Sequence, residues 1–147
     1  MRRMFVLAAT LASATLAFPL TSGVAASAVR TAVPAHLAGT WGKTVPLATW
    51  HKAGVYGDPG GHWKITITNA GVTKMFAPPP PAGFVVTTMT VSTSGTSLVF
   101  GPTADGVCPA KGSYTWNVSG STLVLKVVED GCSPRRVLMT AGPWKRL

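Results

Sequence analysis

Acidic side chains are scarce in this chain, which has four Asp and Glu residues against thirteen Lys and Arg in 147 positions. The four are Asp58, Asp105, Glu129 and Asp130. The last two are adjacent and would point to opposite faces of an extended strand, so they make a poor general acid–base pair. The sequence also lacks a G-x-S-x-G nucleophile motif, a phosphate-binding glycine loop and an H-E-x-x-H zinc motif. We therefore predict that the protein is not an enzyme and has no catalytic residues.

Histidine is also rare, with three residues in the chain. Two of them, His51 and His62, flank a predicted turn together with Asp58 and could converge on a metal or haem, because the arms of a hairpin are neighbours. Histidines that face solvent or pack in the core are the simpler interpretation. We predict no metal site and no cofactor.

Long apolar runs are missing except near the amino terminus, where residues 5–20 are mostly apolar. Arg2 and Arg3 precede this run, and Ala26-Ser27-Ala28 follows it and fits the small-residue rule for signal-peptide cleavage. A membrane anchor is the alternative, but the apolar run is short for a bilayer span. We predict a signal peptide over residues 1–28, no transmembrane anchor in the mature chain, and a secreted or extracytoplasmic location.

Positive charge remains after this processing, since the loss of Arg2 and Arg3 lowers the net charge only from +9 to +7. Such a surface favours anionic partners. The basic residues are scattered singly, apart from Arg135-Arg136 and Lys145-Arg146, and no known nucleic-acid-binding motif occurs. We predict no specific nucleic-acid binding and keep an anionic cell-envelope polymer as a candidate partner.

Cysteine occurs only twice, at Cys108 and Cys132. An even pair in an exported chain usually forms a disulfide, and the pair lacks the C-x-x-C spacing of redox and metal sites. We predict a structural disulfide that closes a loop of about 25 residues, for which the chain-entropy account of disulfides gives about 3.5 kcal/mol of stabilisation.

The clearest secondary-structure signal lies between these cysteines. Residues 113–118 alternate hydroxyl or amide side chains with aromatic or apolar ones, and residues 123–127 repeat the two-residue period. Gly120 and its serine neighbours supply the turn. This stretch predicts a β-hairpin, around which the rest of the domain is organised.

The remainder of the chain is also strand-like, with turn signals every eight to twelve residues. We expect further strands near residues 39–42, 62–69, 72–76, 84–92, 97–101 and 136–141. Residues 47–52 fit either a short strand or one helical turn, and residues 77–83 contain four prolines and predict a loop. Residues 29–37 are expected to be an extended leader, and residues 38–147 one all-β domain: an antiparallel up-and-down β-barrel of about eight strands, with a two-sheet sandwich as the alternative.

A glycine followed two residues later by tryptophan occurs three times, as Gly39/Trp41, Gly61/Trp63 and Gly142/Trp144. The first sits where lipocalins and other calycins carry a G-x-W motif on their first strand, and the C-terminal half resembles small secreted bacterial lipocalin-like proteins. In lipocalins an arginine near the last strand packs across this tryptophan. The resemblance therefore implies that Arg135 or Arg136 lies over Trp41, with Trp41, Arg135 and Trp144 as structural residues.

Large side chains fall on the predicted inward faces of the strands: Trp63, Met89, Phe100, Tyr114 and Trp116. They suit the lining of a cavity for a small hydrophobic molecule, with Tyr114 and the Trp116 indole N–H as polar contacts. They are also what an ordinary core contains. We predict a lipocalin-like protein that binds a small apolar ligand in the barrel. The alternative is a closed barrel whose basic surface acts as an envelope-polymer adhesin or an enzyme inhibitor.

Overall fold

The computed structural model describes residues 32–57, 60–77 and 85–147. The predicted signal peptide, Asp58 and most of the proline-rich loop lie outside these residues. The elements are, in chain order, β1 (Gly39–Val45), α1 (Leu47–Lys52), β2 (Gly61–Ile67), β3 (Val72–Phe76), β4 (Val85–Ser94), β5 (Ser97–Thr103), β6 (Gly112–Ser119), β7 (Thr122–Glu129), α2 (Ser133–Thr140) and β8 (Trp144–Arg146).

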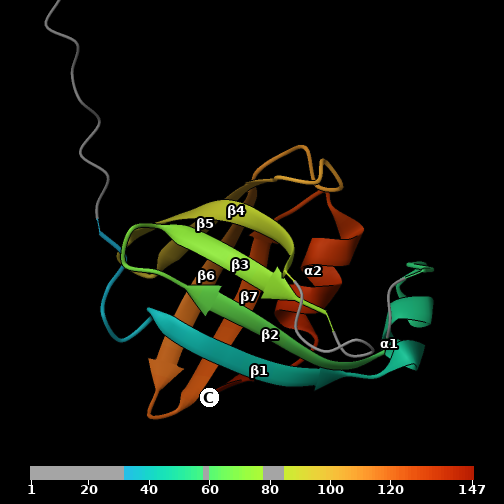
Figure 1. Ribbon diagram of the computed structural model, residues 1–147, viewed down its shortest axis with the longest axis horizontal. Helices are drawn as coiled ribbons and strands as arrows, with labels where there is room; N and C mark the ends of the chain where they lie inside the picture. Colours follow the sequence, from blue (N-terminus) through green and yellow to red (C-terminus); the bar gives the residue numbers. More distant parts are fainter. Residues whose placement is uncertain (1–31, 58–59, 78–84) are drawn as a thin grey trace, which may run out of the picture.

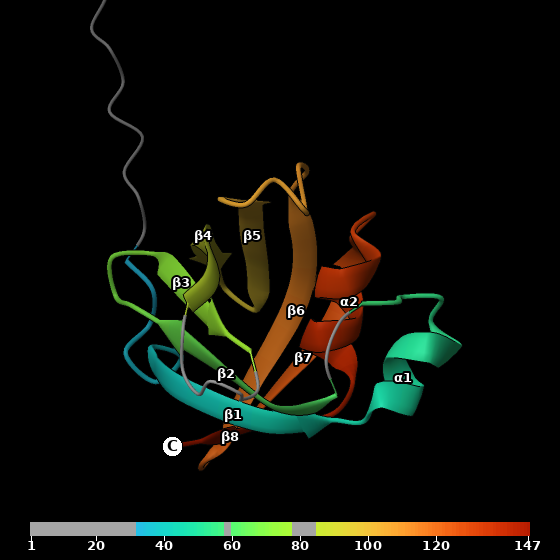
Figure 2. The same cartoon turned by 45° about the vertical axis from the view of Figure 1, so that its right-hand side comes forward.

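The eight strands form one closed antiparallel barrel in which each strand pairs with its neighbours in the sequence and β8 pairs with β1. Figure 1 shows the strands curving around a common interior, and Figure 2 shows α2 lying against the β6–β7 side, with α1 at the tip of the β1–β2 connection. The up-and-down barrel predicted from the sequence is confirmed, as is its single disulfide, Cys108–Cys132. No helix among the described residues is long and apolar enough to cross a membrane.

The alternation in the sequence explains the strands. In β2, Trp63, Ile65 and Ile67 are buried, whereas the residues between them are only half-buried. The predicted hairpin is formed by β6 and β7, whose register pairs Trp116 with Leu125 across the turn. These inward side chains form one continuous core, which is what makes closure of the sheet favourable.

The predicted strand over residues 136–141 is wrong, because residues 136–140 belong to α2. Pro134 occupies the first turn of the helix, where its missing N–H costs nothing, and Gly142-Pro143 follows the helix end. Arg135, Leu138 and Met139 are buried together, as the three- and four-residue spacing of one helix face requires. The last strand is instead β8. Residues 47–52, for which either a short strand or a helical turn was expected, form the helix α1.

Strand β8 closes the barrel with few contacts. It pairs with β1 only at Trp41 and Gly42, and with β7 only at Thr122 and Leu123. By comparison, β1 and β2 are paired over seven positions. Helix α2 packs against β7.

The end of the barrel next to the start of β1 is closed by residues 32–38. The leader is not extended in its described part: it turns at residues 35–37 and buries Val33 and Leu37. The indole Nε1 of the fully buried Trp41 donates a hydrogen bond of 3.0 Å to the Leu37 carbonyl oxygen. This hydrogen bond fixes the end-closing segment to the first strand.

The arginine that covers Trp41 is Arg146, and the prediction of Arg135 or Arg136 is wrong. The Arg146 guanidinium carbon lies 4.2 Å from the Trp41 ring centroid, and its nitrogens donate to the carbonyl oxygens of Ala38 and His36. Arg146 faces Trp41 across the β1–β8 ladder. Arg135 lies in α2 and is bonded to Asp130 and to the Ala110 carbonyl oxygen instead.

The three glycine–tryptophan pairs share a backbone feature: Gly39, Gly61 and Gly142 have positive φ angles of 139°, 131° and 120°. This region is unfavourable for residues with a Cβ. At Gly39 a Cβ would also lie 2.5 Å from an Arg146 guanidinium nitrogen. The tryptophans that follow are 0%, 4% and 0% exposed, and the Trp144 Nε1 donates to the Met139 carbonyl oxygen at 3.3 Å. In each pair, a glycine with a positive φ angle lies two residues before a buried tryptophan.

Lys43 is a charged residue in an unusual place, 6% exposed within the wall beside β8. Its Nζ lies 4.3 Å from the Trp144 ring centroid and donates to the Gly142 carbonyl oxygen at 3.3 Å. Burial lowers the pKa of Lys43 to about 7. Because the unfolded chain retains an ordinary lysine pKa, the folded state binds fewer protons between about pH 7 and about pH 10.4, and Lys43 destabilises the fold most at low pH.

Replacing Lys43 by methionine should therefore stabilise the protein. We expect the free energy of unfolding to rise by about 1–4 kcal/mol below pH 7, the range seen when buried ion pairs are replaced by apolar side chains. The difference from the wild type should shrink as the pH approaches 10.4. Urea unfolding at several pH values measures this, with the exposed Lys126→Met as control. A K43M variant that is less stable than wild type at pH 6 would contradict the assignment.

Candidate functional site

Most of the barrel interior is filled by its own side chains. Met89, Phe100 and Tyr114, three of the predicted ligand contacts, are 4%, 0% and 0% exposed. The Phe100 and Tyr114 rings meet edge to face with centroids 5.6 Å apart. These three side chains belong to the core and fill the barrel interior as in an ordinary close-packed protein.

A pocket remains at the end of the barrel opposite residues 32–38. It has a volume of about 80 Å³ and lies between α1, α2 and the ends of β2 to β5. We call it the α1–α2 pocket. Its lining is mostly apolar and comprises Trp50, Trp63, Met75, Val86, Thr103, Val107, Cys108, Pro134, Arg135 and Leu138. Of the five predicted ligand residues, Trp63 lies here.

Two tryptophans form one side of the α1–α2 pocket. The Trp50 and Trp63 rings are tilted by 50° with centroids 5.6 Å apart. Trp50 comes from α1 and is only 1% exposed, yet its Nε1 is buried without a hydrogen-bond partner. By contrast, the indoles of Trp41 and Trp144, which serve the closure of the barrel, donate to backbone carbonyl oxygens.

The opposite side of the pocket is held by a buried ion pair. The Arg135 Nε donates to an Asp130 carboxylate oxygen at 2.7 Å, and both side chains are fully buried. The remaining Arg135 nitrogens donate to the carbonyl oxygens of Gly101 and Ala110, both at 2.8 Å, and to the second Asp130 oxygen at 3.0 Å. Arg135 thus joins α2 to β5 and to the loop before β6.

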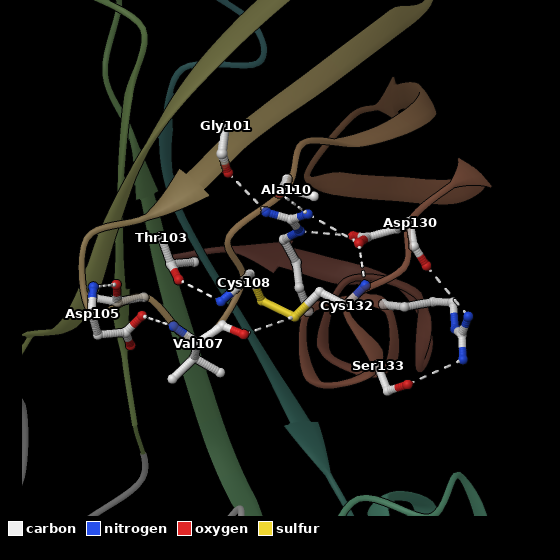
Figure 3. Close-up of a disulfide and its surroundings, with 12 residues drawn as sticks. Gly101, Thr103, Asp105, Val107, Cys108, Ala110, Asp130, Cys132 and Ser133 are labelled. Atoms are coloured by element: carbon white, nitrogen blue, oxygen red, sulfur yellow. Dashed lines mark hydrogen bonds and ion pairs between the residues drawn. A yellow bond between two sulfur atoms is a disulfide. The ribbon is translucent and has the colours of Figure 1, made fainter.

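The disulfide lies next to Asp130 of this ion pair, as Figure 3 shows. The backbone N–H of Cys132 donates to Asp130 at 2.8 Å, and that of Cys108 donates to the Thr103 hydroxyl at 2.9 Å. The Tyr114 hydroxyl also donates to Asp130. The disulfide, the ion pair and Tyr114 therefore form one cluster. This cluster holds Cys108 and Arg135, which line the pocket, in place.

This cluster sets the ionisation of its members. Burial alone would raise the pKa of the Asp130 carboxyl, but hydrogen bonds from Arg135, Tyr114 and the Cys132 N–H outweigh it and hold the pKa below its ordinary value. Burial and the bond to Asp130 raise the pKa of the Tyr114 hydroxyl. Asp130 therefore stays ionised and Tyr114 stays neutral, so Tyr114 is a donor within the core and not a free contact for a ligand.

Trp116 lies at the other end of the molecule. It stacks near His36, with ring centroids 5.2 Å apart, in an open groove of about 520 Å³ beside the β4–β5 turn. Exposed residues of that turn and Asn117 contribute hydroxyl and amide groups to this groove. The structure therefore does not bring the five predicted ligand residues together at one site.

Sequence reasoning missed most of the α1–α2 pocket. Helix α2 supplies three of its lining residues, and the helix was not predicted because residues 136–141 were expected to be a strand. Ser133-Pro134 before the apolar spacing and Gly142-Pro143 after it were the available helix signals. Trp50 was missed for a related reason, since residues 47–52 were left undecided. The partners of Arg135 carry no local signal, because Gly101 and Ala110 contribute only backbone oxygens.

No group of three potential metal-ligating side chains occurs within residues 32–57, 60–77 and 85–147. His51 instead lies near Tyr56, with ring centroids 5.3 Å apart.

The fold and pocket together define a closed eight-stranded antiparallel barrel with a small apolar site at one end. No protein-family model matches the chain, and no curated protein is significantly similar to it. Among solved structures, the chain is similar to the lipoprotein YedD from Klebsiella pneumoniae subsp. pneumoniae MGH 78578, with 15% sequence identity and a TM-score of 0.45, over 81% of this chain and 78% of that one.

Proposed function

We propose that the protein is a secreted, lipocalin-like barrel that binds the end of a small apolar molecule in the α1–α2 pocket. The observation that carries this proposal is the pocket itself, an apolar recess lined by Trp50, Trp63, Met75, Val86 and Leu138. Concave sites walled by aromatic and aliphatic side chains are where proteins bury apolar ligands.

The size of the recess limits what enters it. An apolar cavity of about 150 Å³ holds benzene. The α1–α2 pocket has about 80 Å³ and therefore takes only a few non-hydrogen atoms, with the rest of a longer molecule outside. A narrow chain end fits this space better than a ring system does.

Filling the pocket tests the proposal. Val86→Trp should weaken the affinity for heptan-2-one, a linear apolar probe, by at least tenfold, because the indole would occupy the recess that Val86 lines. Val124→Trp, on the exposed outer side of β7, is the matched control and should bind as the wild type does. Isothermal titration calorimetry gives the affinities, and methyl NMR should show shifts at Met75 and Leu138 but not at Leu123. Equal binding by wild type and V86W would exclude this pocket.

The basic surface supports the second candidate, an envelope-polymer adhesin or enzyme inhibitor. Seven Lys and Arg residues are exposed among the described residues, against the two acids Asp105 and Glu129. If no apolar probe binds the wild type, retention on an anionic polymer at low salt that disappears at high salt would favour this alternative.

A further inference from the structure

The open groove beside the β4–β5 turn lies at the barrel end away from the α1–α2 pocket. We call it the Trp116 groove; its lining includes His36, Ser94, Thr96, Trp116 and Asn117. Its volume is about 520 Å³, against about 80 Å³ for the α1–α2 pocket. Sites that hold whole small molecules have volumes of about 300–1,000 Å³, so this groove has room for a complete ligand unit.

Trp116 contributes carbon surface to the groove. Its ring centroid is 5.2 Å from that of His36, and its backbone N–H donates to the Thr96 carbonyl oxygen at 3.0 Å, so it lies between the end-closing segment and the β4–β5 turn. The residue is half-buried, but its Nε1 is buried. Because Nε1 is the only polar atom of this side chain, the surface that the side chain leaves exposed is carbon.

Polar side chains with no partner in the described protein surround this carbon surface. His36, Ser94, Thr96 and Asn117 line the groove, are exposed, and make no side-chain hydrogen bond to the rest of the described chain. Hydroxyl and amide groups can both donate and accept hydrogen bonds. The groove therefore suits a ligand that itself carries several groups of this kind.

The groove contains no charged partner for a ligand. No Lys, Arg, Asp or Glu is among the described residues that line it. A charged ligand group would lose hydration there without gaining a counter-ion, so a neutral ligand is favoured. A sugar ring combines the required features in one unit: its C–H groups suit the electron-rich surface of an aromatic ring, and its hydroxyl groups project from the rim.

We infer that the Trp116 groove binds one neutral hexopyranose unit of a glycan, with the C–H groups of the sugar against Trp116 and its hydroxyl groups bonded to Asn117 and the β4–β5 turn. This site is separate from the α1–α2 pocket and does not depend on the function proposed for it. Because no ion pair contributes, the binding should persist at high salt, unlike adhesion of the basic surface to an anionic polymer.

The first test titrates the protein with cellotriose, a neutral trimer of glucose, by calorimetry at low and at high salt. Asn117→Ala should weaken the affinity by about tenfold, because hydrogen bonds to the sugar are lost. Thr115→Ala is the matched control: Thr115 is also exposed on β6, two residues before Asn117, but does not line the groove. It should bind as the wild type does. Equal binding by N117A and T115A would overturn the inference.

The second test separates the carbon surface of Trp116 from its N–H. Trp116→Phe keeps an aromatic ring and should retain the affinity for cellotriose to within about threefold, whereas Trp116→Ala should weaken it by about tenfold or more. A proton–nitrogen spectrum checks that the alanine variant is folded, and the exposed Asn117 gives a result that does not depend on it. Equal losses in W116F and W116A would contradict binding through the carbon surface.

Comparison of ligands completes the test. Tri-galacturonate, an anionic trimer, should bind more weakly than cellotriose. If it binds more tightly and is released by salt, the basic surface is the binding site instead, and binding of neither trimer overturns the inference. Val86→Trp should leave cellotriose binding unchanged, and Asn117→Ala should leave heptan-2-one binding unchanged, so failure at one site is distinguishable from failure at the other.

Discussion

Arg135→Met is expected to destabilise the protein by about 3–5 kcal/mol, the cost of removing one partner from a buried ion pair. The Asp130 carboxylate would remain buried without its cation, and the carbonyl oxygens of Gly101 and Ala110 would lose their donors. Because many domains of this size are stable by only about 5–15 kcal/mol, this is a large fraction of the total. Urea unfolding followed by tryptophan fluorescence measures the loss.

The double variant Asp130→Asn/Arg135→Met separates the effect of charge from that of packing. It should recover part of the lost stability, because no uncompensated charge stays in the core. The single Asp130→Asn variant tests the pKa shift: since Asp130 is ionised more readily in the folded state, its stabilising contribution is lost as the pH falls through its lowered pKa. A single R135M variant as stable as wild type would show that the pair contributes nothing.

The second large effect is expected from the disulfide. Replacing both Cys108 and Cys132 by serine should lower the free energy of unfolding by about 3.5 kcal/mol, from the greater freedom of the unfolded chain. The bridge joins residues 24 apart in sequence and ties the loop after β5 to the start of α2. Reversible urea unfolding of wild type and variant under oxidising conditions gives the difference.

Adding a reductant to the wild type is the control for the serine substitutions, since it breaks the same bond without changing the sequence. Both treatments should also weaken the binding of apolar probes, because Cys108, Pro134 and Arg135 line the α1–α2 pocket. A loss of stability below 1 kcal/mol would indicate that the ion pair and core hold this end of the barrel without the bridge.

The barrel could be predicted because its strands carry a local signal. The alternation in residues 113–118 and 123–127 produced the β6–β7 hairpin, and turn residues marked most of the other boundaries. The segment at residues 136–141 was mistaken because Val137, Leu138 and Met139 fit a buried strand as well as a buried helix over so short a length. Because the last strand was expected at residues 136–141, an arginine at the start of that segment, and not Arg146, was expected to lie over Trp41.

The site was less predictable than the fold, for a physical reason. The α1–α2 pocket is built where both helices meet the barrel end, so its residues come from segments that are distant in sequence and share no periodicity. The predicted inward faces were largely correct, as the burial of Trp63, Met89, Phe100 and Tyr114 shows. Which inward residues border a void depends on how tightly their neighbours pack, and a single sequence does not encode that in any local pattern.

The short strand β8 has a consequence for the order of folding. It joins Trp41 and Gly42 to residues 145 and 146, a contact between the two ends of the domain that carries a large loop-closure entropy. The hydrogen-bonding edge of β1 that faces β8 therefore stays unpaired until β8 docks against it. Without β8 in place the sheet has an open edge, and an unpaired strand edge is where separate chains can pair with one another.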